Sequence, residues 1–418
     1  MEHTANHFRY TPLRKKCIRL VKFGSRTTHE RIHLTLMENV SYDDTTLSEN
    51  KRRKYIALSY CWGDPNGRVA IKLNGRNFEI TRSLHAALVA IWAHHRVFDA
   101  YWIDAICIDQ GNVRERNVQV ARMWQIFRYA TRVFAWLGDE DASMVSLARR
   151  FDCIHHQLPE RLEAEPPGGD QWSTEDPIDF MVHTLLRNPY FSRTWILTEF
   201  TQAKRLDLVC GSMRCDFQHI DALLDMEEDT TVKRTNSAIH NRHRFSRFSK
   251  EYLTGRYDES KQLQALEDCI ISYSMTSCQN PRDKVFAMLN HPSNTIRPRG
   301  SRARHLRPDY SMDEDELLVR TVAWINDTCE DFERGKEFQK GRHNEIDLGV
   351  NTPRIASYVV DALGVGTDVV DERAFDTWLV AHHDWVCLPC RIRLLDGTSV
   401  LRDQLLGTFL FSAARKLE

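Results

Sequence analysis

Residues 55–138 alternate short apolar segments with segments of helical periodicity, and this alternation constrains the fold more than any other feature. Residues 55–60 (YIALSY) form an apolar run that the turn residues CWGDPNG bring to an end. Residues 83–94 place apolar side chains on one helical face, and residues 101–108 and 131–137 are further strand-like runs. Because strands and helices follow one another with short connections, the sequence predicts an α/β fold, an open parallel sheet flanked by helices.

The remaining segments complete a predicted domain organisation. Asn112 and Glu115 have the spacing of a capped helix N-terminus, and an apolar stripe continues from there to residue 130. A helix at 193–203 capped by Ser192 and a strand at 205–210 close a domain at residues 1–212, with its core at about 52–212. Residues 213–334 are predicted to be a helical region, and residues 335–418 a linker with a small β-rich terminal segment. The expected helices of the middle region are 216–228, 260–275, 281–290 and 313–328.

The composition is that of an ordinary soluble protein. The 418 residues hold 57 Lys and Arg against 58 Asp and Glu, a net charge of -1, so no global field favours nucleic acid or an anionic membrane. The basic and aromatic stretch at 240–248 is interpreted as a solvated helix face. No apolar run reaches the roughly 18 residues of a membrane span, and no signal peptide is evident. The eleven scattered cysteines indicate reduced thiols, so we expect a cytoplasmic protein, with a nuclear setting also compatible.

Several common kinds of site are absent from the sequence. There is no G-x-G-x-x-G after a strand, no P-loop, no H-E-x-x-H and no G-x-S-x-G. Cys387 and Cys390 lack the second pair that a zinc site needs, and the pair His94–His95 is interpreted as solvated surface histidines. The sequence therefore predicts neither a metal site nor a bound cofactor.

Polar residues lie where the predicted strands end. Ser59 and Tyr60, followed by Trp62, end the first strand, and Asp109 and Gln110 follow the second. Open parallel sheets bind their ligands beyond the carboxyl ends of the strands, which makes these residues candidates for ligand contact. Anchoring a loop requires the same residue types, so both interpretations of Asp109 and Gln110 stay open.

Two aspartates interrupt the apolar run at 101–108 and its end. If the strand is regular, Asp104 and Asp109 point to opposite faces and do not form an acid/base pair. A carboxylate in an apolar strand costs several kcal/mol unless it is hydrogen-bonded or paired. We therefore expect Asp104 to be structural, held by backbone amides or an arginine.

Glu199 is the most prominent single carboxylate outside these strands. It follows Trp195 by one helical turn in the segment RTWILTEF, so both side chains share a face of the predicted helix. An indole beside a carboxylate removes water from it, which suits acid/base catalysis. The alternative, which composition alone favours, is an exposed helical glutamate.

Three blocks of sequence together resemble the HET (heterokaryon incompatibility) domain of filamentous fungi. They are residues 55–64 (YIALSYCWGD), residues 102–138 (WIDAICIDQ, then ER, QV, M and WLG) and residues 191–199 (FSRTWILTE). The flanking motifs FRYTPL and IRL, CQNPRDKVFAML and RPDYS, and WVCL near the end resemble members of the family as well. The resemblance covers most of the chain.

This resemblance implies non-self recognition and a cell-death reaction. HET domains are remotely similar to TIR domains, so the resemblance implies a TIR-like, flavodoxin-like sheet. Several TIR domains cleave NAD+ with a glutamate in a W-C-x-x-E-like pattern, whose spacing Trp195 and Glu199 keep, with Ile196 in place of the Cys. Glu199 is therefore the expected catalytic residue, and Asp104, Gly63 and Arg193 are assigned structural roles. The expected substrate-binding residues are Ser59, Tyr60, Trp62, Asp109, Gln110 and Trp195.

Two functions stay open at this point. In the first, the domain hydrolyses NAD+ or a related nucleotide, which is a substrate and not a cofactor. In the second, the same sheet is a non-catalytic signalling module that self-associates or binds a cell-death partner, and Glu199 is a packing or salt-bridge residue. The surroundings of Glu199 distinguish them: an open cleft near Tyr60 and Asp109 favours the first, and a buried position favours the second.

Overall fold

The chain folds into two compact units, Met1–Asp258 and Glu259–Glu418. The computed structural model describes residues 8–41, 53–96, 100–139, 188–217, 276–289, 306–313, 316–317 and 320–321. The sheet and all residues discussed as a site belong to the first unit. The finer division at residues 212 and 334 stays a prediction.

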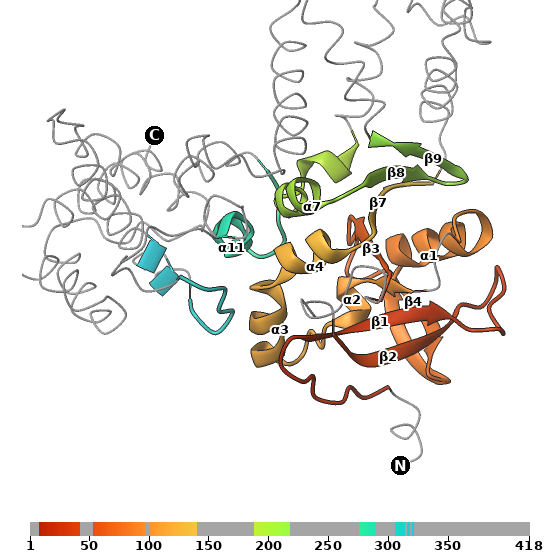
Figure 1. Ribbon diagram of the computed structural model, residues 1–418, viewed down its shortest axis with the longest axis horizontal. Helices are drawn as coiled ribbons and strands as arrows, with labels where there is room; N and C mark the ends of the chain where they lie inside the picture. Colours follow the sequence, from red (N-terminus) through yellow and green to blue (C-terminus); the bar gives the residue numbers. More distant parts are fainter. Residues whose placement is uncertain are drawn as a thin grey trace, which may run out of the picture. The chain divides into compact units, whose positions relative to one another are not determined.

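The first unit is built on one nine-stranded sheet with the order β5-β4-β2-β1-β6-β3-β7-β8-β9 (Figure 1). Its central strands pair in parallel and confirm the predicted α/β fold. The middle strand β3 is buried along its whole length, as expected for a parallel strand covered on both faces. These parallel strands are β6 (Tyr101–Trp102), β3 (Ile56–Tyr60), β7 (Arg132–Gly138) and β8 (Leu206–Cys210).

The sheet is mixed, so the prediction of a parallel sheet is correct only for its centre. The pairs β1–β2, β1–β6, β4–β5 and β8–β9 are antiparallel, whereas β2 and β4 pair in parallel. Two-residue turns explain the pairs β4–β5 and β8–β9, because so short a connection joins only antiparallel strands. The outer strands are β1 (Cys17–Phe23), β2 (His33–Ser41), β4 (Arg68–Leu73), β5 (Arg76–Thr81) and β9 (Met213–Asp216).

Helices cover both faces of the central strands. Figure 1 shows α1 (Arg82–His94) on one side of β3 and β7, with α4 (Met123–Tyr129) and α7 (Ile196–Gln202) on the other. The chain moves from β3 to β6 in one direction along the sheet and from β6 through β7 to β8 in the other, so crossovers of the usual right hand are expected to place helices on both faces. The predicted helix at 83–94 is confirmed, with Thr81 as its N-cap.

Residues 101–108 differ most from the prediction. Only Tyr101–Trp102 pair as a strand, and the chain then turns into the short helix α2 (Asp104–Cys107). The turn buries Ile106 and Cys107. The expectation that Asp104 and Asp109 lie on opposite faces of one strand is therefore wrong.

Helix ends agree with the prediction at one point and differ at two. The Asn112 side chain accepts a hydrogen bond from the Glu115 N–H at 3.2 Å and caps α3 (Val113–Val120), as predicted. The helix does not run unbroken to residue 130, because α4 begins anew at Met123. Ser192 ends the 3₁₀ helix η3 (Pro189–Ser192) and donates to the Pro189 carbonyl at 2.8 Å, so it is not the cap of α7.

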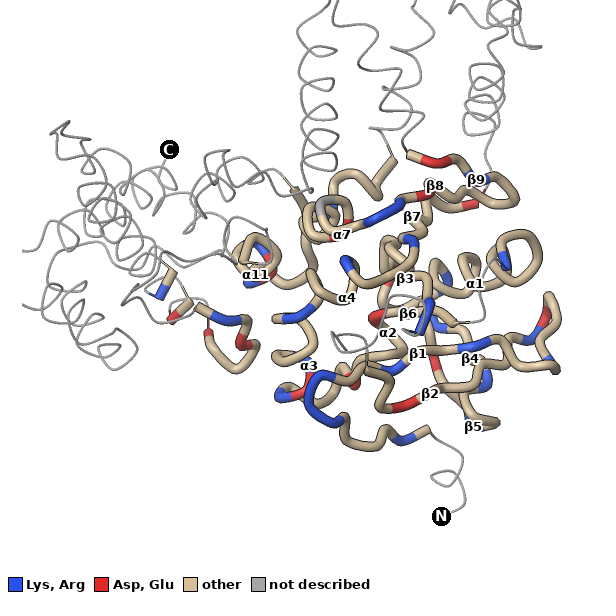
Figure 2. The backbone as a smooth tube through the Cα atoms, in the orientation of Figure 1, with Lys and Arg blue, Asp and Glu red and all other residues tan. Residues whose placement is uncertain are grey.

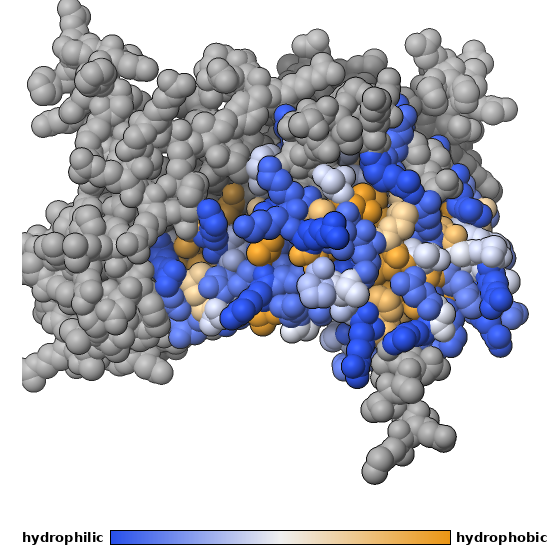
Figure 3. All heavy atoms as spheres, turned by 60° about the horizontal axis from the view of Figure 1, so that its bottom comes forward, coloured by the Kyte–Doolittle hydropathy of each residue, from blue (hydrophilic) through white to orange (hydrophobic). Residues whose placement is uncertain are grey.

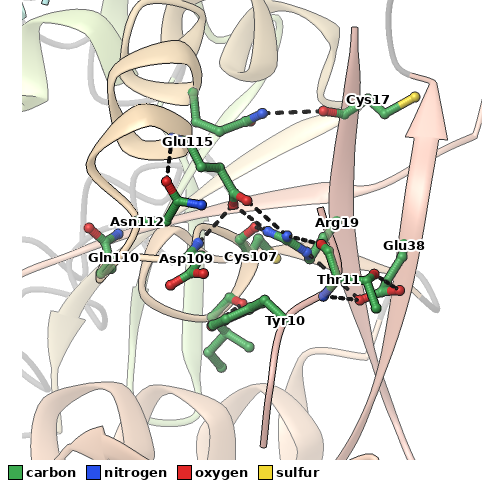
Figure 4. A network of polar contacts seen from close by, with 12 residues as sticks. Tyr10, Thr11, Cys17, Arg19, Glu38, Cys107, Asp109, Gln110, Asn112 and Glu115 are labelled. Carbon is green, nitrogen blue, oxygen red and sulfur yellow. Dashed lines mark hydrogen bonds and ion pairs between the residues drawn. The ribbon is translucent and has the colours of Figure 1, made fainter. Parts of the chain in front are cut away.

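A buried network ties the N-terminal segment to the connection between α2 and α3 (Figure 4). Arg19 on β1 is 0% exposed, and its guanidinium donates to both carboxylate oxygens of Glu115. The same guanidinium donates to the carbonyls of Cys107 at 3.1 Å and Thr11 at 2.6 Å, and its carbon lies 4.6 Å from the ring centre of Tyr10. The segment before residue 55 is thus an integral part of the sheet domain.

In the second unit, α11 (Asp283–Leu289) confirms the predicted helix at 281–290. Residues 316–317 and 320–321 are helical, in agreement with the helix expected at 313–328. The remaining predicted helices, apart from residues 216–217, lie outside the described residues, as do residues 240–248, Cys387, Cys390 and the terminal β-rich segment.

The described surface carries both charge signs. Figure 2 shows Lys and Arg interspersed with Asp and Glu across the described elements, and Figure 3 shows a mainly hydrophilic face with scattered apolar residues. Within the described ranges, none of the helices combines the length and the apolar character needed to cross a bilayer.

Candidate functional site

Glu199 lies at the centre of a buried polar cluster beside the carboxyl-terminal half of β3. It projects from α7, whose neighbouring side chains Ile196, Leu197 and Phe200 are fully buried. Because this helix is enclosed by apolar contacts, Glu199 is only 3% exposed. The interpretation of Glu199 as an exposed helical residue is therefore wrong.

The Glu199 carboxylate accepts three hydrogen bonds. Arg193 binds it through two parallel contacts, Nη1 to Oε2 at 2.8 Å and Nη2 to Oε1 at 2.9 Å. The Ser59 hydroxyl, on β3, donates to the same Oε2. A bidentate arginine–carboxylate pair fixes the plane of the guanidinium relative to the plane of the carboxylate, so the position of Glu199 is tightly defined.

Ser59 connects the carboxylate to a buried tyrosine. Its oxygen lies 2.5 Å from the Tyr190 hydroxyl and 3.2 Å from Arg193 Nη1. Burial and then the charge of Glu199 raise the pKa of Tyr190 well above its ordinary value, so this phenol keeps its proton. Although burial opposes its charge, Arg193 has a raised pKa because Glu199 stabilises the guanidinium.

A second carboxylate, Asp104, lies close enough to Arg193 and Glu199 for their charges to act on its pKa. Its Oδ2 accepts from the Trp62 indole at 2.8 Å, and its Oδ1 accepts from the Ala105 N–H at 2.7 Å. Burial raises the pKa of Asp104 to about 6, against the opposing effects of these hydrogen bonds and of Arg193. Asp104 is thus held by an indole and one backbone amide, not by a direct ion pair with an arginine.

The cluster has a buried inner part and a half-buried outer part. Ser59, Tyr60, Tyr190 and Glu199 are buried. The side that water reaches is formed by Cys61, Trp62, Asp104 and Arg193, which are all half-buried. Burial raises the pKa of the Cys61 thiol, so this residue is not an activated nucleophile.

The structure brings some of the predicted site residues together and separates others. Ser59, Tyr60 and Trp62 approach Glu199 or Asp104, as the strand-end argument expects. Trp195 is the half-buried N-cap of α7, where its carbonyl accepts from the Glu199 N–H at 3.2 Å. Gly63 turns the chain after β3 with φ of 73°, a left-handed conformation that favours glycine.

Asp109 and Gln110 act within their own loop. The Asp109 N–H donates to Glu115 at 2.9 Å, which places it in the Arg19 network (Figure 4). The Gln110 side chain donates to the Asp104 carbonyl at 3.1 Å. These contacts are of the loop-anchoring kind that the sequence left open. His95, expected on the surface, is 4% exposed and contacts the Gly211 carbonyl at 2.9 Å through Nε2.

Sequence reasoning missed one member of the cluster, Tyr190, and the partner of another, Arg193. Tyr190 lies in the turn NPYFS and carried no signal of its own beyond an aromatic residue after a proline. Arg193 was assigned a structural role, but its pairing with Glu199 could not be derived from a six-residue spacing that spans a 3₁₀ helix and a new α-helix.

The fold and the cluster define a class, an α/β domain on a mixed sheet with two carboxylates gathered beside the end of its central parallel strand. Comparison with known proteins gives the family. Residues 55–199 match the family described as heterokaryon incompatibility protein (HET), so the chain carries a HET domain. Both ends of the match, Tyr55 and Glu199, belong to the sheet domain.

One curated relative is heterokaryon incompatibility protein 6, OR allele, of Neurospora crassa. It is 29% identical over 208 residues, which are 41% of this chain and 31% of the relative. The matched region of this chain thus spans less than a third of the length of this relative. No solved structure matches the chain.

Proposed function

We propose that this chain acts in fungal non-self recognition and the cell death that follows it. Two findings support the proposal: the HET family match at residues 55–199 and the relative named as a heterokaryon incompatibility protein. We place this action in the cytoplasm, in agreement with the scattered cysteines.

We further propose that the domain acts by TIR-like hydrolysis of NAD+ at the bond between nicotinamide and ribose. The observation that carries this proposal is the position of Glu199, which is fixed by Ser59 and Arg193 beside the carboxyl-terminal half of β3. Open α/β sheets bind nucleotides at this edge. Buried carboxylates in a charged cluster are also characteristic of functional sites.

The chemistry requires one carboxylate. As the bond breaks, its electron pair moves to the pyridinium nitrogen, and nicotinamide leaves as a neutral molecule without a general acid. Positive charge develops on the ribose ring, as in glycoside hydrolysis, and Glu199 stabilises that charge and orients the ribose hydroxyls. The bonds from Arg193 and Ser59 leave one acceptor position, on Oε1, so a ribose hydroxyl donates there or replaces one of the bonds from Arg193.

The burial of Glu199, which is 3% exposed, and its ion pair with Arg193 favour a second candidate, a non-catalytic module, as a buried position of this residue was expected to do. A buried, bidentate Arg193–Glu199 pair is a common way to hold two segments together, and here it joins the end of η3 to α7. On this alternative the sheet self-associates or binds a signalling partner, and Glu199 only stabilises the fold.

The test incubates concentrated, purified protein with NAD+ and measures nicotinamide release. Wild type is compared with Glu199→Gln and with Glu79→Gln, a matched control at an exposed position on β5. We expect release by wild type and the control, and a loss of about 10²-fold or more in Glu199→Gln, because the charge that stabilises the transition state is gone.

Circular dichroism and thermal unfolding establish that each variant is folded. Equal release by Glu199→Gln and wild type contradicts the catalytic role of Glu199. No release by folded, assembled wild type leaves the non-catalytic module as the function.

A further inference from the structure

The two carboxylates of the cluster differ in their exposure to water and in the number of hydrogen-bond acceptor positions that remain free. Glu199 accepts three hydrogen bonds, which leave one acceptor position on Oε1, and the side chain is only 3% exposed. Asp104 is half-buried and accepts one hydrogen bond at each oxygen. Each carboxylate oxygen can accept two hydrogen bonds, so Asp104 retains one free acceptor position per oxygen on the side that water reaches.

The buried hydroxyl of Tyr60 lies beside this carboxylate. Tyr60 is 1% exposed, and the charge of Asp104 and a weak side-chain hydrogen bond with it contribute to the raised pKa of Tyr60. In the described part of the chain, this contact falls short of a well-formed hydrogen bond, and the hydroxyl has no other hydrogen-bond partner. An unsatisfied buried hydroxyl costs about 1–3 kcal/mol, and a water molecule held between Tyr60 and Asp104 satisfies both groups.

The polar surroundings of Asp104 come from several elements. Tyr60 keeps its proton, because burial and then the charge of Asp104 raise its pKa well above the ordinary value. The indole of Trp62 and the Ala105 amide donate to the carboxylate. The ionisable groups that act on Asp104, or on which it acts, are Tyr60, Cys107, Arg193 and Glu199.

We propose that Asp104 is the general base of the NAD+ hydrolysis proposed above, and that Tyr60 and Asp104 hold the attacking water between them. This inference rests on the proposed function. The bond from ribose C1′ to the nicotinamide nitrogen breaks, with its electron pair going to that nitrogen. A new bond forms between C1′ and the water oxygen, and the water proton passes to the Asp104 carboxylate, which later releases it to solvent. The products are nicotinamide, ADP-ribose and one proton.

This assignment gives each carboxylate a separate task. Glu199 faces the developing positive charge, whereas Asp104 accepts a proton, for which a group near neutrality is suited. Burial raises the pKa of Asp104 to about 6, so the base is ionised at neutral pH and protonated in mild acid. The rate at low NAD+ concentration should therefore rise with pH around 6.

The experiment measures the pH dependence of kcat/KM for nicotinamide release between pH 4.5 and 8.5. Wild type, Asp104→Asn and the exposed control Glu79→Gln are compared. We expect Asp104→Asn to lose about 10²- to 10⁴-fold at pH 7.5 and to lose the rise near pH 6. The control Glu79→Gln should keep the wild-type rate at pH 7.5 and the rise near pH 6.

A second variant, Trp62→Phe, guards against an effect of folding alone. In wild type, the indole N–H of Trp62 donates to Asp104 and lowers the pKa of this carboxyl. The substitution removes that N–H and raises the pKa, so the rise in rate should move to higher pH. If Asp104 only stabilised the fold, Trp62→Phe would not shift the midpoint of the pH–rate profile.

Each failure has a distinct signature. If wild type releases nicotinamide and Glu199→Gln does not, but Asp104→Asn keeps the wild-type rate and pH profile, the role of Asp104 is overturned and the proposed function stands. If Trp62→Phe leaves the midpoint unmoved, the titrating group is not Asp104. If wild type releases no nicotinamide, the proposed function fails and this inference falls with it.

Discussion

At the scale of single residues, the Arg193–Glu199 pair determines both the stability of the cluster and its resting state. The Arg193 side chain is 17% exposed and Glu199 is 3% exposed, so the pair is largely shielded from water. Its removal leaves a buried carboxylate without its main partner. The pair also occupies the carboxylate that the proposed reaction needs, which links the stability of the domain to its activity.

Arg193→Ala should lower the free energy of unfolding by about 3–5 kcal/mol, because Glu199 then stays buried and unpaired. Urea unfolding followed by tryptophan fluorescence measures this change. The matched control is Arg205→Ala, whose guanidinium is 57% exposed and lies 3.6 Å from Asp216, and which should cost at most about 1 kcal/mol. Equal effects of the two substitutions would contradict the account of the cluster.

Asp104 should make the stability of the domain depend on pH. The folded protein holds the Asp104 proton up to about pH 6, whereas the unfolded chain releases it near 3.8. The native state therefore binds more protons between these values, and wild type should lose about 1–3 kcal/mol relative to Asp104→Asn as pH rises from 4 to 7. Urea unfolding of both proteins across this range measures the difference, and a constant difference would contradict the raised pKa.

At the scale of elements, local chemistry explains which parts of the fold could be predicted. The cap at Asn112 and the runs at 55–60 and 131–137 follow from side-chain patterns within a few residues. Residues 101–108 look like a strand because they form an apolar run broken only by Asp104, but a helical turn also buries Ile106 and Cys107. Asn74 and Gly75 form the two-residue turn between β4 and β5, both with positive φ, and this Asn-Gly pair is a hairpin signal within the sequence itself.

The cap of α3 can be tested alone. Asn112→Ala removes the side-chain oxygen that accepts from the Glu115 N–H and should cost about 1 kcal/mol of unfolding free energy. Asn112→Asp keeps an acceptor and should stay within about 0.5 kcal/mol of wild type. Denaturant titration of both variants measures the costs, and an equal loss in both would show that the cap bond is not the cause.

At the scale of the whole molecule, the family match is smaller than the folding unit. The match begins at residue 55, yet β1 lies between β2 and β6 in the sheet, and Arg19 binds Glu115 inside the match. No sequence pattern could show this, because the contacts join residues that are 96 positions apart. The same holds for the contact between Ser59 and Glu199, which are 140 positions apart.

A chain that starts at residue 53 should therefore lose its cooperative unfolding transition, because β6 loses its neighbour β1 and Glu115 loses Arg19. A chain that starts at residue 8 retains all the described strands and serves as the control. Calorimetry of the two chains checks this, and a cooperative transition in the shorter one would show that β1 and β2 are dispensable.

The central claim is that the cluster around Glu199 breaks the bond between nicotinamide and ribose. Proton NMR of NAD+ incubated with the full chain follows substrate and both products in one sample. We predict equal amounts of nicotinamide and ADP-ribose with wild type and Glu79→Gln, and neither product with folded Glu199→Gln. Intact NAD+ after incubation with folded, concentrated wild type, or equal product with Glu199→Gln, would contradict the account.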